Sequence, residues 1–112
     1  MASYALAGRG VNTRAKGVRF EREVADVFTA AGFAVRGLEA IGDHLILRRD
    51  GLVLSSECKR REKLSIGAWW KQTVADAPDG AVPLLTFRQA RGEMLSLVRT
   101  EDLVRLIARA SS

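Results

Sequence analysis

The spacing of apolar residues predicts that the folded part of the chain begins with an amphipathic helix over residues 13–31. Gly32 follows this segment, in the position where a left-handed residue ends a helix at least cost. We expect residues 33–36 to form a short strand, and the aperiodic residues 1–12 to form a flexible N-terminal arm before a domain over 13–112. The apolar face of the helix repeats at intervals of three and four residues: Phe20, Val24, Val27, Phe28 and Ala31.

Two apolar runs, residues 44–48 and 52–59, flank Asp50-Gly51, and this arrangement predicts a β-hairpin. Both runs are apolar on both faces near the turn, so we expect a sheet covered on two sides. Two registers are possible. A three-residue loop over 49–51 places Asp43 directly opposite Glu57, whereas a two-residue turn offsets this pair by one step. In either register both carboxylates lie at the open end of the hairpin.

The remaining pattern predicts a second helix, two more strands and a last helix. The second helix spans residues 65–77, begins at the N-cap Ser65 and ends before Pro78-Asp79-Gly80. Strands over 82–87 and 94–98 are joined through residues 90–92, and Thr100 caps the last helix. The expected buried side chains are Ile66, Trp70, Val74 and Ala77 in the second helix and Leu103, Leu106 and Ile107 in the last.

The resulting element order is α-β-β-β-α-β-β-α, which predicts a single α/β domain with a mixed central sheet flanked by helices. The length of 112 residues allows one domain, and 47% apolar with 28% charged residues is an ordinary globular balance. No apolar run approaches the roughly 18 residues of a membrane helix, and no secretory signal is recognisable at the start. The single cysteine, Cys58, excludes an internal disulfide and favours a reducing, cytoplasmic setting.

Charge points to a polyanionic partner. Lys and Arg total 18 against 13 Asp and Glu, a net charge of +5. Basic side chains neutralise phosphates and release condensed counterions, so we expect nucleic acid as the partner. Aromatic residues make up only 6% of the chain, which excludes a broad platform for stacking bases. The expected DNA contacts lie in the N-terminal fifth and in the basic run 59–63: Arg9, Arg14, Lys16, Arg22, Arg60, Arg61 and Lys63.

The open end of the hairpin gathers residues that could carry chemistry. Strand residues alternate between faces, so Glu57 and Lys59 point to one side and Cys58 to the other. With Asp43, two carboxylates and a lysine converge there, and hard oxygen ligands suit Mg²⁺ or Mn²⁺ rather than zinc. The alternative is that Asp43 is a turn residue and that Glu57 and Lys59 form an exposed ion pair. We expect His44, the only histidine, to serve packing or the sheet edge.

These residues carry a resemblance. Gly42-Asp43, the hairpin and Glu57-Cys58-Lys59 together resemble the signature of PD-(D/E)XK nucleases, with Gly in the place of Pro. Residues 16–24 and 31–36 are similar to the opening of archaeal and phage Holliday-junction resolvases. The resemblance covers residues 16–60 by motif and 61–107 by element order. Residues 37–41 lack the Ser-rich run that those resolvases often carry.

The resemblance implies a restriction-endonuclease-like core and a metal-dependent endonuclease acting on DNA in recombination. Asp43 and Glu57 would hold Mg²⁺ with the backbone carbonyl of Cys58, and Lys59 would orient or polarise the attacking water. Glu21 would reach the ion from the first helix, although helix periodicity alone does not choose between Glu21 and Glu23. Relatives also place a glutamine on the second helix near the site, which implies that Gln72 contacts DNA.

A four-way DNA junction is the expected substrate, and a homodimer the expected assembly. Resolving a junction takes two nicks, whereas each chain has sequence for one site, so a two-fold dimer would supply the second. Apolar surface beyond one small core points the same way, at Trp69, residues 84–85 and 95–98 and the last helix. The alternatives are a nuclease acting on other branched or duplex DNA, and a basic nucleic-acid-binding module without catalysis.

Overall fold

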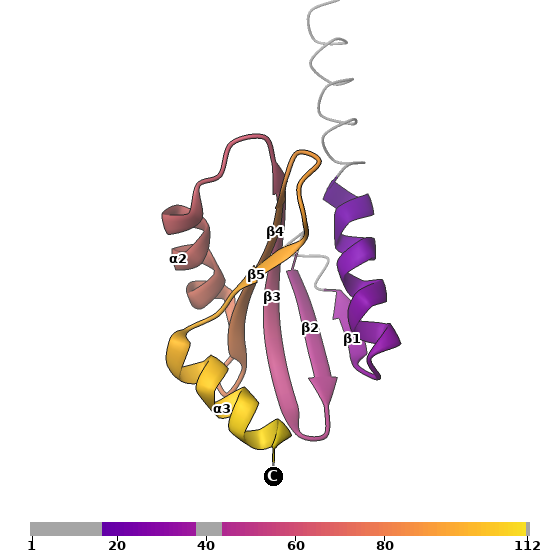
Figure 1. Cartoon of the computed structure of the whole chain (residues 1–112), viewed down its shortest axis with the longest axis vertical. Helices are drawn as coiled ribbons and strands as arrows, with labels where there is room; N and C mark the ends of the chain where they lie inside the picture. Colours follow the sequence, from indigo (N-terminus) through magenta and orange to yellow (C-terminus); the bar gives the residue numbers. More distant parts are fainter. Residues whose placement is uncertain (1–16, 38–43, 112) are drawn as a thin grey trace, which may run out of the picture.

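The computed structural model describes residues 17–37 and 44–111, in which three helices flank one five-stranded sheet (Figure 1). The first helix occupies residues 17–30 and follows the predicted apolar period. The predicted element order is confirmed over these residues. The remaining elements are β1 (Ala34–Gly37), β2 (His44–Arg49), β3 (Leu52–Arg61), α2 (Ile66–Asp76), β4 (Val82–Gln89), β5 (Leu95–Leu97) and α3 (Thr100–Ala110).

The sheet is mixed, as predicted, with the strands in chain order from β1 to β5. Only β3 and β4 are parallel, and α2 makes the crossover between them. The other pairs are antiparallel. Because the crossover needs a helix on one face of the sheet, this connection places α2 over β3 and β4.

The turn between β2 and β3 has two residues. Asp50 has φ of 49° and Gly51 has φ of 81°, and two positive angles in succession are the mark of the tight hairpin turn that matches strand twist. This turn pairs His44 with Glu57. Of the two possible registers, the one with Asp43 directly opposite Glu57 is therefore wrong. Asp43 itself lies outside the described residues.

The sheet is covered on both faces, as the hairpin sequence predicted. The first helix covers one face of the sheet and α2 lies on the other (Figure 1). Alternate residues of β2, β3 and β4 form the apolar core with the first helix. The intervening residues, Glu57 among them, face α2. The buried core on the first-helix side consists of Phe20, Val24, Leu45, Leu47, Leu54, Cys58 and Leu84.

The first two helices bury slightly different stripes from those predicted. In the first helix Phe20 and Val24 are buried and Phe28 is half-buried, whereas Val27 is 55% exposed because it lies on the helix flank. Ala31, beyond the helix end, is also exposed. In α2 the most buried residue is Thr73, and the four predicted residues and Trp69 are half-buried. The short α2 covers mainly polar side chains, so its apolar stripe is only partly enclosed.

The predicted inward face of α3 is wrong. Leu103 is 44% and Ile107 58% exposed, while Asp102 is buried and Leu106 half-buried. The side of α3 that faces the sheet carries Asp102 and Leu106, which line a hollow with Leu52 and Val82. Arg109 donates a hydrogen bond to the carbonyl of Asp50, so the C-terminal end of the helix lies beside the β2–β3 turn (Figure 1). Thr100 is the first helical residue rather than the cap. No helix in the described ranges combines the length and apolarity needed to cross a membrane.

Candidate functional site

The α2 face of β3 carries an acid and a base inside the protein. Glu57 is wholly buried and Lys59 is 8% exposed, and two residues of strand separation put both on the same face. Ionisable side chains are almost never this buried without partners, because removing a charge from water is costly. The alternative interpretation of Glu57 and Lys59 as an exposed surface pair is therefore wrong.

His44 links Glu57 to a buried hydroxyl. Its Nδ1 lies 2.8 Å from Oε1 of Glu57, and its Nε2 lies 2.5 Å from Oγ of Ser55. An ionised carboxylate can only accept, so Nδ1–H donates to Glu57, and Nε2 shares a hydrogen bond with the Ser55 hydroxyl. All three side chains are fully buried. The Ser55–His44–Glu57 chain thus fixes the orientation of the Glu57 carboxylate.

This chain has the residue order of a hydrolase triad, but its burial excludes that role. A nucleophilic serine must itself touch the substrate, which the full burial of Ser55 within β3 prevents, whereas an equally buried carboxylate can act through a bound ion. His44 therefore acts on Glu57 as a positioning residue. The hydroxyl of Ser55 in turn fixes the imidazole.

Asp76, the last residue of α2, completes a group that could hold a metal ion. One ligand atom from each of His44, Glu57 and Asp76 lies within 4.8 Å of the other two. Both imidazole nitrogens of His44 already form hydrogen bonds, to Glu57 and to Ser55. The ligand atoms for a metal ion would therefore be carboxylate oxygens of Glu57 and Asp76. Carboxylate oxygens are the donors that Mg²⁺ and Mn²⁺ prefer, and the site fits these ions. Asp43 precedes His44 in the sequence.

The other predicted site residues lie on the opposite face of the sheet. Cys58 is buried in the core against the first helix, as the alternation of β3 requires, and its backbone carbonyl stays a predicted ligand. Glu21 is half-buried, with Oε1 3.6 Å from where a Cβ on Gly37 would lie. Glu23 is instead paired with Arg88 at 2.5 Å. Of the two helix carboxylates, Glu21 is thus the one beside β1.

The predicted DNA contacts are mostly exposed where the structure describes them. Arg22, Arg61, Lys63 and Gln72 are exposed, and Arg60 is half-buried. Arg9, Arg14 and Lys16 lie outside the described residues. The first helix, β3 and β4 also bring together arginines that the sequence did not single out as contacts: Arg19, Arg88 and Arg91.

Two residues beside Glu57, the buried His44 and the half-buried Asp76, were not predicted as part of the site. The Asp50-Gly51 signal favours a two-residue turn, and choosing that register would have placed His44 opposite Glu57. Asp76 lies three residues after the buried Thr73, which is the spacing of one helix face. A buried face of α2 centred on Thr73, rather than on Trp70, would have placed Asp76 on the side of the helix that faces the sheet.

Known proteins offer no guide to this site. Comparisons with protein-family models, with curated proteins and with solved structures found no match.

Proposed function

We propose that the chain is a metal-dependent DNA endonuclease with a restriction-endonuclease-like core, acting on four-way junctions. One observation carries the proposal: a wholly buried Glu57, oriented by His44 and close to Asp76, shares its face with Lys59. Two carboxylates, one wholly buried and one half-buried, together with a lysine form a donor set suited to metal-assisted phosphodiester hydrolysis. The hairpin that carries it begins one residue after Asp43, the remaining element of the resemblance.

In this proposal Asp43 and Glu57 hold Mg²⁺ or Mn²⁺, with Asp76 as a further oxygen donor. The ion supplies a water that deprotonates more readily and charge compensation for the phosphate. Lys59 orients the attacking water or stabilises negative charge on the phosphate oxygens. Exclusion of bulk water around Glu57 strengthens these interactions, because charges attract more strongly at low dielectric.

The proposal is tested by incubating the purified chain with a synthetic four-way junction and with plasmid DNA. We expect cleavage of the junction in Mg²⁺ and none in chelator. Cleavage of plasmid alone would support the alternative of a nuclease for simple duplexes. Binding to both DNAs without cleavage in Mg²⁺ or in Mn²⁺ would contradict the enzyme and support the alternative of a basic nucleic-acid-binding module.

Removing the positioning residue should weaken the metal site without removing its carboxylates. His44→Ala takes away the donor to Glu57, and we expect the Mg²⁺ concentration for half-maximal cleavage to rise about 10–100-fold. His44→Asn retains an N–H near the position of Nδ1 and should recover part of this loss. A metal dependence identical to that of the unchanged chain in both variants would limit His44 to a packing role. Thermal unfolding of each variant checks that the fold persists.

Association as a homodimer is the second part of the proposal. The apolar face of α3 is solvent-exposed within one chain at Leu103, Val104 and Ile107, and Leu95 of β5 is also exposed. Leu84 and Leu85, by contrast, are buried within the chain and add nothing to this surface. Stable dimers bury about 1,200–2,000 Å² in total, and the α3 face is an apolar centre for such an interface.

Light scattering at micromolar concentration should therefore give twice the chain mass of 12.2 kDa. The double variant Leu103→Glu with Ile107→Glu places two charges at the centre of the interface, and we expect it to be monomeric. Val27→Glu, at a similarly exposed apolar position of the first helix, should remain dimeric. A monomer for the unchanged chain, with and without junction DNA, would rule this assembly out.

A further inference from the structure

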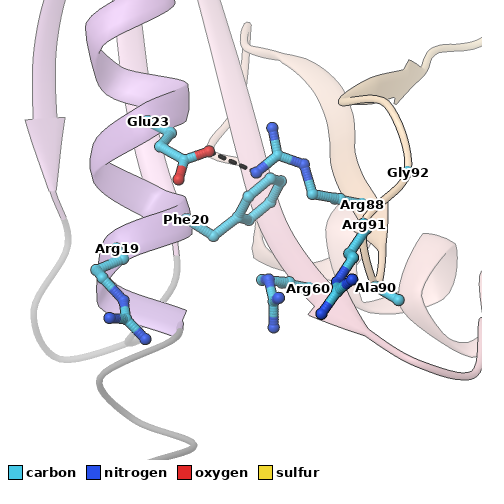
Figure 2. Close-up of a pocket in the computed structure, with 8 residues that line it drawn as sticks. All are labelled: Arg19, Phe20, Glu23, Arg60, Arg88, Ala90, Arg91 and Gly92. Carbon is cyan, nitrogen blue, oxygen red and sulfur yellow. Dashed lines mark hydrogen bonds and ion pairs between the residues drawn. The ribbon is translucent and has the colours of Figure 1, made fainter.

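A hollow of about 390 Å³ lies between the first helix and the ends of β3 and β4 (Figure 2). Arg60 alternates with Lys59 along β3, and Phe20 belongs to the first helix, so the hollow is on the face opposite Glu57. Four of its eight lining residues are arginines. The full lining is Arg19, Phe20, Glu23, Arg60, Arg88, Ala90, Arg91 and Gly92.

One of the arginines is held in place by neutralising contacts. Arg88 forms an ion pair with Glu23 at 2.5 Å, and its guanidinium lies 5.3 Å from the centre of the Phe20 ring (Figure 2). No carboxylate in the described ranges pairs with the guanidinium of Arg19, Arg60 or Arg91. Three positive groups converge on one hollow, where an anion would relieve their mutual repulsion.

The turn after β4 fixes Arg91 at the rim. Ala90 has φ of 47° and donates its N–H to the carbonyl of Arg61, which ties the turn to the end of β3. Gly92 is required there, because a Cβ would lie 2.9 Å from the carbonyl oxygen of Gln89. The arginine between them therefore projects from a tight, hydrogen-bonded turn. The turn thus sets the position from which the exposed Arg91 side chain reaches the hollow.

The chemistry of the lining selects phosphate over a base. Guanidinium groups match phosphate oxygens with paired N–H donors. Phe20 is 1% exposed and lies under Arg88, so its ring offers no surface for a base to stack on. Recognition here would thus be independent of nucleotide sequence.

We infer that this hollow is a phosphate-binding pocket that takes a backbone phosphate of DNA. The DNA source of the phosphate rests on the proposed function, whereas the phosphate chemistry rests on the arginines alone. The pocket and Glu57 lie on opposite faces of β3, with Glu57 four residues before the end of the strand at Arg61. The exposed Arg61 and Lys63 lie at and just beyond this end. DNA that contacts both faces passes around this end of the sheet.

The test measures binding in chelator, so that cleavage plays no part. Inorganic phosphate is titrated by thermal shift, and a duplex without terminal phosphates by fluorescence anisotropy at several salt concentrations. The double variant Arg60→Gln with Arg91→Gln should lose the thermal shift and bind the duplex about tenfold or more weakly. Its salt dependence should fall by about one unit of slope, the value of one phosphate contact. Arg48→Gln, at an exposed arginine near the β2–β3 turn, is the matched control and should behave as the unchanged chain.

The phosphate and duplex measurements on the Arg60/Arg91 variants separate the pocket from the source of its phosphate. A double variant that matches the unchanged chain with both probes overturns the pocket, even if the chain cleaves DNA. Loss of the phosphate shift with unchanged duplex binding overturns DNA as the source and leaves a site for free phosphate. Loss of both in a chain that never cleaves DNA supports the pocket and removes only the proposed enzyme. The variant Arg60→Lys with Arg91→Lys retains the charge and should recover part of the binding, which separates this effect from misfolding.

Discussion

Glu57→Gln and Asp43→Asn are each expected to abolish metal-dependent cleavage of DNA and to leave DNA binding close to that of the unchanged chain. Each substitution exchanges an anionic oxygen donor for a neutral amide of nearly the same shape. A hard divalent cation binds such a site far more weakly. Phosphate contacts come from Lys and Arg elsewhere, so affinity for the junction should persist.

The measurement is single-turnover cleavage of a labelled four-way junction, with binding followed separately in chelator. Glu57→Gln keeps an oxygen that can accept from His44, and its thermal unfolding should stay near that of the unchanged chain. Glu62→Gln removes an exposed carboxylate five residues further along and should cleave normally. Full activity of either site variant in Mg²⁺ would show that the carboxylates at this end of the hairpin do not hold the ion.

Lys59→Ala should slow cleavage at saturating DNA about 10²-fold or more and change affinity little. The ammonium group is almost fully enclosed, on the same face as Glu57, so it is poorly placed to add a contact to the outside of a duplex. Its removal takes a positive charge away from the place where negative charge develops during hydrolysis. The expected signature is a lower maximal rate with an unchanged half-saturating DNA concentration.

Lys63→Ala provides the comparison, because Lys63 is an exposed cation of the same basic run. We expect this variant to need more DNA for half-saturation and to reach the normal maximal rate. The opposite assignment would follow if Lys59→Ala weakened affinity alone. Lys59 would then be a phosphate contact, and the proposal would lose the cation that orients the attacking water or stabilises negative charge on the phosphate.

The sheet could be predicted almost strand by strand, because its signals are local. Asp50-Gly51 supplies the two positive φ angles of the turn, and the apolar runs on either side of it can only be strands of a covered sheet. The alternation of β3 likewise placed Glu57 and Lys59 on one face and Cys58 on the other before any tertiary contact was known.

The orientation of α3 and the position of Asp76 depend on tertiary packing and could not be predicted from the sequence. The amphipathic pattern of α3 identified a helix with an apolar face, but not what that face contacts. In the folded chain Asp102 and Leu106 face the sheet, and Leu103 and Ile107 are exposed. Similarly, Asp76 comes within reach of Glu57 only through the crossover that seats α2 on β3. Both features depend on contacts between residues far apart in the chain, and the period of apolar residues within one helix does not predict such contacts.

The alternation of β3 makes the length of this strand a functional constraint. Glu57 and Lys59 lie on the α2 face of the sheet, with Asp76 near Glu57, while Cys58 and Arg60 face the core and the arginine hollow. Inserting or deleting one residue between the turn and Glu57 would exchange the two sets, because a one-residue slip reverses every side chain of a strand. Homologues of this chain should therefore differ in β3 by substitution and not by length, and should accept insertions in the exposed segment between β3 and α2.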